Sequence, residues 1–225
     1  MTRRMKDTIC TVCIGIAVIL ALVGVGFLLK AKMDEERHCE VIRDTVEEVD
    51  DYIAQNKGEE AKPVIMLVDK DAYEVPGEEY DFGYEESSEQ TYITGIGILE
   101  IPCINSKLTI MEGTSNTDLR YGVGHYTPSA PLGGMGNCTI LGHHMKAYGS
   151  IFNRLSEVDA GDTVKVTDIY GNQYVYEVDD TRIVHPSYLM EYLETGDTDT
   201  ARITLITCAY TSEGKQRLVV TGHMI

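Results

Sequence analysis

A run of 22 uncharged residues near the N-terminus constrains the fold more than any other feature: TICTVCIGIAVILALVGVGFLL, residues 8–29. As a helix that rises about 1.5 Å per residue, this run spans ~33 Å, which is enough to cross the hydrocarbon core of a bilayer. Arg3, Arg4 and Lys6 precede it, and positive charge before a span favours a cytoplasmic N-terminus. A cleaved signal peptide would have a shorter apolar core followed by a small-residue cleavage site. We therefore predict an uncleaved, single-pass anchor in the cell membrane, with the rest of the chain outside the cell.

The charge balance and the cysteines exclude several classes of protein. The net charge is −17, with 36 acidic and 19 basic residues, whereas a nucleic-acid-binding protein needs a basic face. Cys10 and Cys13 lie inside the apolar run, where they act as small apolar residues. The other cysteines show neither zinc-site spacing nor a dense disulfide framework, so a free one among them is a candidate nucleophile: Cys39, Cys103, Cys138 and Cys208.

A helix is expected after the anchor, because apolar residues recur at spacings of four, three and four: Ile42, Val46, Val49 and Ile53. Asn56 and Gly58 supply the stop signal. Beyond them, the segment from Asp71 to Gln90 has eight acidic residues, no basic residue and several interleaved aromatic residues. This composition predicts a solvated linker. The alternative is an arm that folds over a neighbouring groove and regulates it.

From about residue 94 the chain is dominated by short apolar runs bounded by turn residues, which are typical of β-strands. Seven or eight such strands in this length predict a mainly β fold, either a closed barrel or a sandwich. A hairpin is expected at DIYGNQ, residues 168–173, and short helical pieces are expected around 150–158 and 187–193. The predicted strands are 95–102, 107–112, 138–144, 162–168, 173–184, 201–208 and 217–225.

The stretch ITLITCAYTSEGKQRLVVTG, residues 203–222, predicts a second hairpin. With its turn centred on residues 212 and 213, Cys208 and Arg217 face each other and point to the same side of the sheet. A nearby guanidinium favours the nucleophilic thiolate and can donate hydrogen bonds to an oxyanion during acyl transfer.

A third group is needed to carry protons, and histidine is the usual one. His143 and His144 end the strand-like CTILG, and their side chains should point to opposite sides of the extended chain. His125, His185 and His223 are the further histidines outside the anchor that spacing alone does not exclude. We expect His125, in YGVGHY, to have a structural role.

Taken together, these motifs resemble the sortase transpeptidases. The resemblance covers about residues 94–225, and it rests on TLITC (204–208), Arg217 nine residues later, and the Gly-His pair upstream. It extends through residues 96–126 and through GNCTILGHH, residues 136–144. The resemblance implies an eight-stranded sortase-type β-barrel with short helices and a membrane-anchored cysteine transpeptidase.

By the same resemblance, the catalytic residues are Cys208 as nucleophile, His143 as proton carrier and Arg217 as oxyanion or substrate ligand. Thr207 corresponds to a position that lines the family's substrate groove, and His144 is then a residue of the groove rim or a packing residue. The implied substrates are surface proteins with a C-terminal LPxTG-like sorting signal, cut between Thr and Gly. The acceptor is an amine of a peptidoglycan precursor, and no metal or organic cofactor is required.

Three sequence features bear on which sortase subgroup the chain resembles. The loop HYTPSAPLGGMGN, residues 125–137, has no Asp or Glu, so we expect no calcium activation. No Asp-Pro-aromatic lid motif precedes the barrel, and the chain ends in its last strand, which argues against pilin polymerisation without excluding it. GHHMKAYGSIF is similar to class B sortases, whereas LRYGVGHY and TLITC are closer to classes A, C or D.

The alternatives to cell-wall transfer are a pilin-polymerising sortase, a cysteine endopeptidase that ends in water, and an inactive extracellular binding module. Cys103 and Cys138 are expected in strands, either as free thiols or as a disulfide.

The predicted parts of the chain are a cytoplasmic N-terminus (1–7), a transmembrane anchor (8–30), a stalk helix (31–58), an acidic linker or arm (59–93) and a catalytic barrel (94–225).

Overall fold

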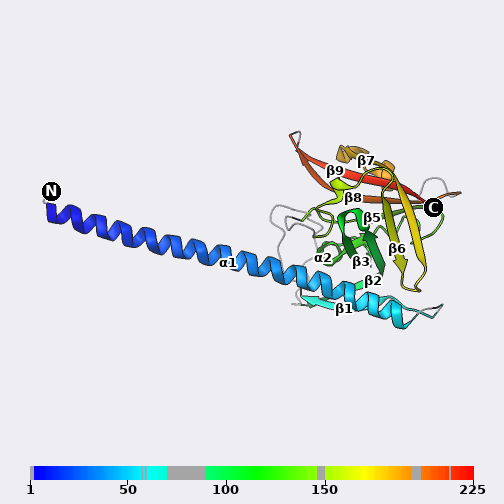
Figure 1. Cartoon of the computed structure of the whole chain (residues 1–225), viewed down its shortest axis with the longest axis horizontal. Coiled ribbons are helices and arrows are strands. Elements are labelled where there is room, and N and C mark those ends of the chain that lie inside the picture. The colour runs from blue at the N-terminus through cyan, green and yellow to red at the C-terminus, as the bar shows by residue number, and fades with distance from the viewer. Residues whose placement is uncertain are drawn as a thin grey trace.

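A computed structural model describes residues 3–56, 58, 60–69, 90–145, 150–193, 199–212 and 214–225. A long helix, α1 (Arg3–Gln55), is followed by a β-rich domain (Figure 1). The strands are β1 (Val64–Asp69), β2 (Gln90–Ile101), β3 (Ser106–Glu112), β4 (Val123–His125), β5 (Gly136–Leu141), β6 (Thr163–Asp168), β7 (Gln173–Val184), β8 (Ala201–Thr211) and β9 (Gly214–Met224). The short helices are η1 (Pro102–Ile104), α2 (Asn116–Tyr121), η2 (Leu155–Glu157), η3 (Pro186–Tyr188) and α3 (Met190–Leu193).

The strands form one sheet in the order β1-β2-β3-β4-β5-β8-β9-β7-β6. The sheet closes because β2 also pairs with β6, with Gly97–Glu100 opposite Lys165–Asp168. Eight strands, β2 to β9, therefore make a ring, which confirms the predicted mainly β barrel. β1 lies outside the ring and pairs with the first half of β2, from Gln90 to Gly95.

Two hydrophobic clusters stabilise the domain. The larger one includes Leu99, Ile110, Ile140 and Leu205 from the strands of the ring, together with Phe152 from the segment after β5. The smaller one lies between α1 and the outside of the ring, and it joins helix residues to strand residues. Its members include Val49, Ile53, Met66, Ile93, Met111 and Tyr121.

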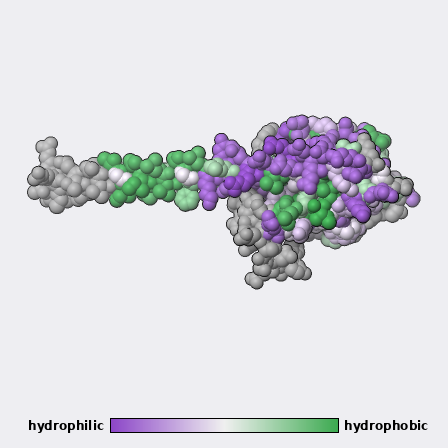
Figure 2. All heavy atoms as spheres, turned by 90° about the horizontal axis from the view of Figure 1, so that it is seen from below, coloured by the Kyte–Doolittle hydropathy of each residue, from purple (hydrophilic) through white to green (hydrophobic). Residues whose placement is uncertain are grey.

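The helix α1 combines an exposed apolar part with a docked part. From Ile14 to Leu29 its side chains are exposed, and Figure 2 shows this stretch as a green rod that projects from the domain. Among the described residues, α1 is the one helix that is long and apolar enough to cross a membrane. Nearer its C-terminal end, a buried stripe faces the barrel: His38, Ile42, Thr45, Val49 and Ile53. The predicted apolar stripe is confirmed, and two polar residues that the pattern did not include belong to it.

Polar contacts also attach α1 to the barrel. The Lys107 ammonium of β3 lies 2.6 Å from the Asp50 carboxylate. The Thr45 hydroxyl donates a hydrogen bond of 2.8 Å to the Ile42 carbonyl oxygen and lies 3.4 Å from the Tyr121 carbonyl oxygen. The predicted stalk is therefore packed against the β-rich domain over about its last five turns, from His38 to Gln55.

Two strands were missed by the sequence analysis. β1 lies inside the segment 59–93 that was predicted as an acidic linker, because the acidic composition of the whole segment outweighed its first apolar residues. β4 has only three residues, too few to show an alternating pattern. The predicted hairpin at 168–173 is confirmed, since Thr167 pairs with Gln173. The acidic run 70–89 and its proposed regulatory role lie outside the described residues.

Candidate active site

The antiparallel hairpin of β8 and β9 positions the thiol and the guanidinium. Cys208 is the register partner of Arg217, and the last pair before the turn is Thr211 with Gly214. This confirms the predicted register. Directly opposed residues project their side chains to the same face of the sheet. The short turn thus fixes Cys208 and Arg217 side by side.

His143 reaches the same place from a neighbouring parallel strand. β5 pairs with β8 in parallel, with Leu141 beside Ile206, and the Gly142 amide donates a 3.0 Å hydrogen bond to the Ile206 carbonyl oxygen. Because the strands run in parallel, His143, two residues after Leu141, is level with Cys208, two residues after Ile206. Gly142 permits this turn, because a Cβ at its position would lie 2.5 Å from the Phe152 ring. The Gly-His motif is therefore a packing requirement as well as a sequence pattern.

All three predicted catalytic residues line one pocket of about 210 Å³. Cys208 and His143 are only 5% and 6% exposed, so the pocket shields them from bulk water. The pocket walls are mainly apolar, as is usual for ligand sites. The other lining residues are Thr114, Asn116, Leu119, Leu141, Gly142, Leu189, Ile206 and Thr207.

The two predicted substrate-binding residues lie in different surroundings. Thr207 lines the pocket, and its buried hydroxyl oxygen has no hydrogen-bond partner among the residues that the structure describes. His144 forms a β-bridge with Ile151, and its ring centroid lies 6.0 Å from that of Tyr210. His144 is not among the residues that line the pocket. Because Thr207 borders the pocket and His144 does not, Thr207 is the stronger candidate of the two.

One wall of the pocket was missed by the sequence analysis. Thr114, Asn116 and Leu119 belong to α2 and the turn before it. This helix begins with a capping box, in which the Asp118 amide donates to the Ser115 hydroxyl and the Asp118 carboxylate accepts from the Ser115 amide. The Ser-x-x-Asp spacing is a readable signal for such a helix start. Leu189, which also lines the pocket, comes from the connection between β7 and β8, and no sequence motif marks it.

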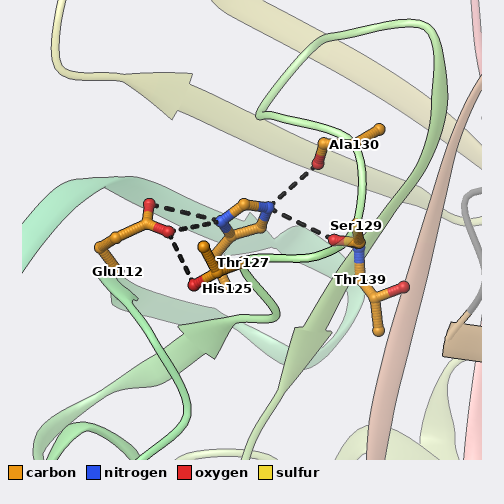
Figure 3. A network of polar contacts seen from close by, with 6 residues as sticks. All are labelled: Glu112, His125, Thr127, Ser129, Ala130 and Thr139. Carbon is orange, nitrogen blue, oxygen red and sulfur yellow. Dashed lines mark hydrogen bonds and ion pairs between the residues drawn. The ribbon is translucent and has the colours of Figure 1, made fainter.

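His125 lies in a separate, closed network, shown in Figure 3. Its Nδ1 is 3.3 Å from the Glu112 carboxylate, and its Nε2 is 3.0 Å from the Ala130 carbonyl oxygen and 3.3 Å from the Ser129 hydroxyl. The order of Ser129, His125 and Glu112 resembles a hydrolytic triad. However, the carbonyl oxygen of Ala130 can only accept, so Nε2 donates its proton there and is not free to act as a base.

The Ser129 hydroxyl oxygen also accepts a 3.0 Å hydrogen bond from the Thr139 amide (Figure 3). The network therefore ties the loop after β4 to strands β3 and β5. This arrangement supports the expected structural role of His125.

The remaining histidines and thiols lie outside the pocket lining. His185 and His223 are held in surface contacts, to the Ser187 hydroxyl at 2.8 Å and the Asp179 carboxylate at 2.6 Å. Cys103 and Cys138 are free thiols, so the disulfide alternative is wrong for this structure. Cys138 lies in β5 as predicted, but Cys103 lies in η1 because Pro102 begins a 3-10 turn there, so its predicted place in a strand is wrong. Burial raises the pKa of Cys138 to about 12, and burial together with the Asp162 carboxylate raises that of Cys103 to about 11. Both thiols are thus poor nucleophiles at neutral pH.

The described residues contain no group of three or more His, Cys, Asp or Glu side chains that could hold a metal ion. A thiol, an imidazole and a guanidinium that converge on a shielded cavity are suited to nucleophilic acyl transfer.

Comparisons with known proteins agree with this chemistry. Residues 99–225 match the family model of the sortase domain. Sortase A of Listeria monocytogenes is 31% identical over 129 residues, and sortase D of Bacillus subtilis is 33% identical over 132 residues. These matches cover 57% of the chain and 56% and 63% of the two relatives, so the chain matches less than two thirds of either relative's length.

Solved sortase structures are also similar to this chain. A Clostridium perfringens sortase D5 transpeptidase superposes with a TM-score of 0.52 at 28% identity, covering 58% of the chain and 79% of that structure. Sortase C1 of Streptococcus agalactiae superposes with a TM-score of 0.53 at 30% identity, covering 58% of the chain and 67% of that structure. The similarity is thus concentrated in the β-barrel.

Proposed function

Because the chain belongs to the sortase family, we propose that it is a membrane-anchored cysteine transpeptidase with Cys208, His143 and Arg217 as its catalytic residues. The observation that carries the proposal is the register of the β8–β9 hairpin, which pairs Cys208 with Arg217 beside a pocket that His143 also lines. The α1 anchor has its N-terminus in the cytoplasm, so that the barrel acts outside the cell.

In the first half of the reaction, the Cys208 thiolate attacks a peptide carbonyl carbon and forms a tetrahedral oxyanion. Arg217 donates hydrogen bonds to that oxyanion. The C–N bond then breaks, His143 as imidazolium gives its proton to the departing amine, and a thioester with Cys208 remains.

In the second half, an incoming amine attacks the thioester. His143, now neutral, takes a proton from that amine, the C–S bond breaks, and a new amide bond forms. Thr207, which precedes the nucleophile, lines the groove beside the reacting thiol. The substrate is a surface protein with an LPxTG-like signal, cut between Thr and Gly, and the acceptor is an amine of a peptidoglycan precursor.

Two other outcomes use the same site. In a pilin-polymerising enzyme the acceptor is a lysine of another protein, and in an endopeptidase it is water. The two outcomes differ in the acceptor that attacks the thioester, so product analysis with and without amines distinguishes them.

The test uses the full chain in detergent micelles, a library of LPxTG-like peptides, and triglycine, diaminopimelate and lysine peptides as acceptors. Mass spectrometry follows adducts and products. We expect a thioacyl adduct on Cys208, cleavage after Thr and transfer to one class of amine. Cys138→Ala, which removes a thiol outside the pocket, should still form the adduct.

Formation of free acid in the presence of every amine would identify an endopeptidase instead. If the folded chain forms no adduct with any peptide, and Cys208 reacts with iodoacetamide no faster than the thiols of the denatured chain, the inactive binding module is the better assignment.

A further inference from the structure

A buried polar cluster continues the floor of the pocket in the direction away from the thiol. Asn137, Thr139 and Leu141 share one face of β5, because side chains alternate along a strand. The parallel register places Thr139 beside Thr204 and Leu141 beside Ile206. Leu141 and Ile206 line the pocket, whereas Asn137, Thr139 and Thr204 are buried farther along the same face. The proposed reaction does not use these three polar side chains.

The hydrogen bonds of this cluster converge on one carbonyl oxygen. The side-chain amide of Asn137 donates to the Tyr192 carbonyl oxygen at 2.9 Å and to the Thr139 hydroxyl oxygen at 3.2 Å. The Thr139 hydroxyl donates to the same carbonyl oxygen at 3.4 Å, and the Thr204 hydroxyl donates to the Asn137 side-chain oxygen at 2.8 Å. Tyr192 belongs to α3, in the connection between β7 and β8. Strands β5 and β8 thus hold this connection by its backbone.

The held peptide group lies next to a wall of the pocket. The Tyr192 amide donates a 3.0 Å hydrogen bond to the Leu189 carbonyl oxygen, and Leu189 lines the pocket. A continuous path of hydrogen bonds therefore runs from Asn137 through Tyr192 to the residue that forms this wall.

The burial of three polar side chains in one place calls for a reason, because each costs free energy unless it is hydrogen-bonded. Asn137, Thr139 and Thr204 are 9%, 0% and 3% exposed. Apolar side chains would cover the same surface, but they would not select one position of the connection. A polar network with satisfied hydrogen bonds specifies a single arrangement.

We propose that Asn137 is a positioning residue that holds the β7–β8 connection over β5 and β8, so that Leu189 forms a fixed wall of the pocket before the substrate binds. The inference rests on the proposed function only in treating this pocket as the substrate site. A wall that is already in place spares the substrate the entropy cost of ordering it. Loss of the Asn137 contact therefore weakens substrate binding and leaves the chemistry of the thiol unchanged.

The kinetic test compares two Asn→Asp variants of the full chain in detergent micelles. Asn137→Asp keeps the shape of the side chain and its acceptor for Thr204, but it replaces the donor that faces the Tyr192 carbonyl oxygen with an acceptor. We expect KM for the best LPxTG-like peptide to rise about tenfold while kcat stays within about twofold. Asn105→Asp makes the same change at an exposed residue outside the pocket lining and should alter neither constant.

A second variant adds no charge and serves if Asn137→Asp does not fold. Thr204→Val removes the hydroxyl that orients the Asn137 amide. KM should rise in the same direction by about threefold, with kcat again nearly unchanged.

A fluorescent reporter follows the wall without any substrate. The chain contains no tryptophan, so Met190→Trp, at an exposed position of α3 beside Leu189, introduces a single fluorophore. We expect Asn137→Asp to enlarge the fast component of its fluorescence anisotropy decay. Asn105→Asp should leave the decay as it is.

Two results would overturn the proposal. One is an unchanged anisotropy decay in folded Asn137→Asp, which would show that other contacts hold the wall. The other is a decrease in kcat that follows the loss of folded protein, with KM at the native value, because Asn137 would then support only the fold. If the native chain turns over no peptide, the transpeptidase assignment fails, and the anisotropy decay still decides whether Asn137 holds the wall.

Discussion

His125 and His143 are both buried histidines close to the ends of neighbouring strands, yet their surroundings differ. Both ring nitrogens of His125 lie within 3.4 Å of polar partners in a closed network. His143, by contrast, lines a pocket of about 210 Å³ that Cys208 and Arg217 also line. The difference teaches that a buried histidine enclosed by a network of protein partners stabilises the fold, whereas one that borders a cavity shared with a thiol and a guanidinium is placed for chemistry.

The two buried thiols repeat this contrast. Cys138 lies in the interior of the ring, where it packs against the main hydrophobic cluster. Cys208 lies on β8 where it borders the pocket and opposes Arg217. Burial alone therefore does not distinguish a structural cysteine from a nucleophile; the neighbouring cavity and cation do.

The largest expected effect is the loss of acyl transfer in Cys208→Ala. Peptide cleavage and amine transfer should fall below detection, because no other described thiol borders the pocket. Thermal unfolding should stay close to that of the native chain. Turnover at the native rate in this variant would show that Cys208 is not the nucleophile. The contrast between Cys208 and Cys138 would then have no chemical meaning.

Arg217→Lys should reduce kcat/KM by about 10²-fold, the size typical for the loss of an oxyanion donor. Lysine keeps the charge but loses the planar fork of donors. Steady-state kinetics with the best peptide measures the effect. A matched control is Arg202→Lys, because Arg202 lies on the same hairpin and pairs with Asp179 at the surface.

His125→Leu should destabilise the fold by about 2 kcal/mol, because it leaves the Ala130 carbonyl oxygen and the Ser129 hydroxyl without a ring partner. Urea denaturation measures this change. In the folded variant the alkylation rate of Cys208 should stay within about twofold of the native rate. A large loss of Cys208 reactivity in fully folded His125→Leu would show that the two regions are not separate. His185→Leu, at an exposed histidine, is the control for stability.

The free energy of unfolding should decrease as the pH rises from about 9 towards 12. Burial raises the pKa of folded Cys138 from 9.0 to about 12, so the unfolded chain releases this proton first. The stabilisation is complete below pH 9 and is lost as the pH approaches 12. Burial raises the pKa of Tyr176 in the same direction. The slope of stability against pH in Cys138→Ala should therefore be shallower than in the native chain but not zero, and an identical slope would contradict the assignment to Cys138.

The smallest effect is expected for His144→Gln. His144 packs near Tyr210 outside the pocket lining, so kcat/KM should change by no more than about twofold. A decrease as large as that of Arg217→Lys would instead place His144 in the substrate groove, as the sequence analysis predicted.

The sequence was sufficient where local chemistry determines the structure. The turn after Thr211 sets the register of the β8–β9 hairpin, so the pairing of Cys208 with Arg217 follows from residue counting. Seven strands of the ring have the length and pattern of ordinary strands. The Gly-His pair at the end of β5 was readable as a motif, although the reason for the glycine, its contact with Phe152, was not.

Features that depend on docking were not predictable. His38 and Thr45 are polar residues in the buried stripe of α1, and only the barrel surface determines that this face is covered. β1 pairs with the free edge of β2, and its apolar sequence VIMLVD was outweighed by the acidic composition of the segment around it. Leu189 borders the pocket because the connection between β7 and β8 folds back over it.

The unbroken course of α1 from its apolar stretch to its docked stripe also determines how far the pocket lies from a bilayer. The stretch ends at Leu29, His38 lies nine residues later, and a helical rise of 1.5 Å per residue gives a separation of ~14 Å along the axis. The tip of the β8–β9 hairpin points towards the same end of α1 (Figure 1). With the apolar stretch in a membrane, the fixed length of the helix keeps the pocket within a few nanometres of the lipid headgroups. Under the proposed function, a peptide bond could then reach this pocket only where it lies close to the membrane surface.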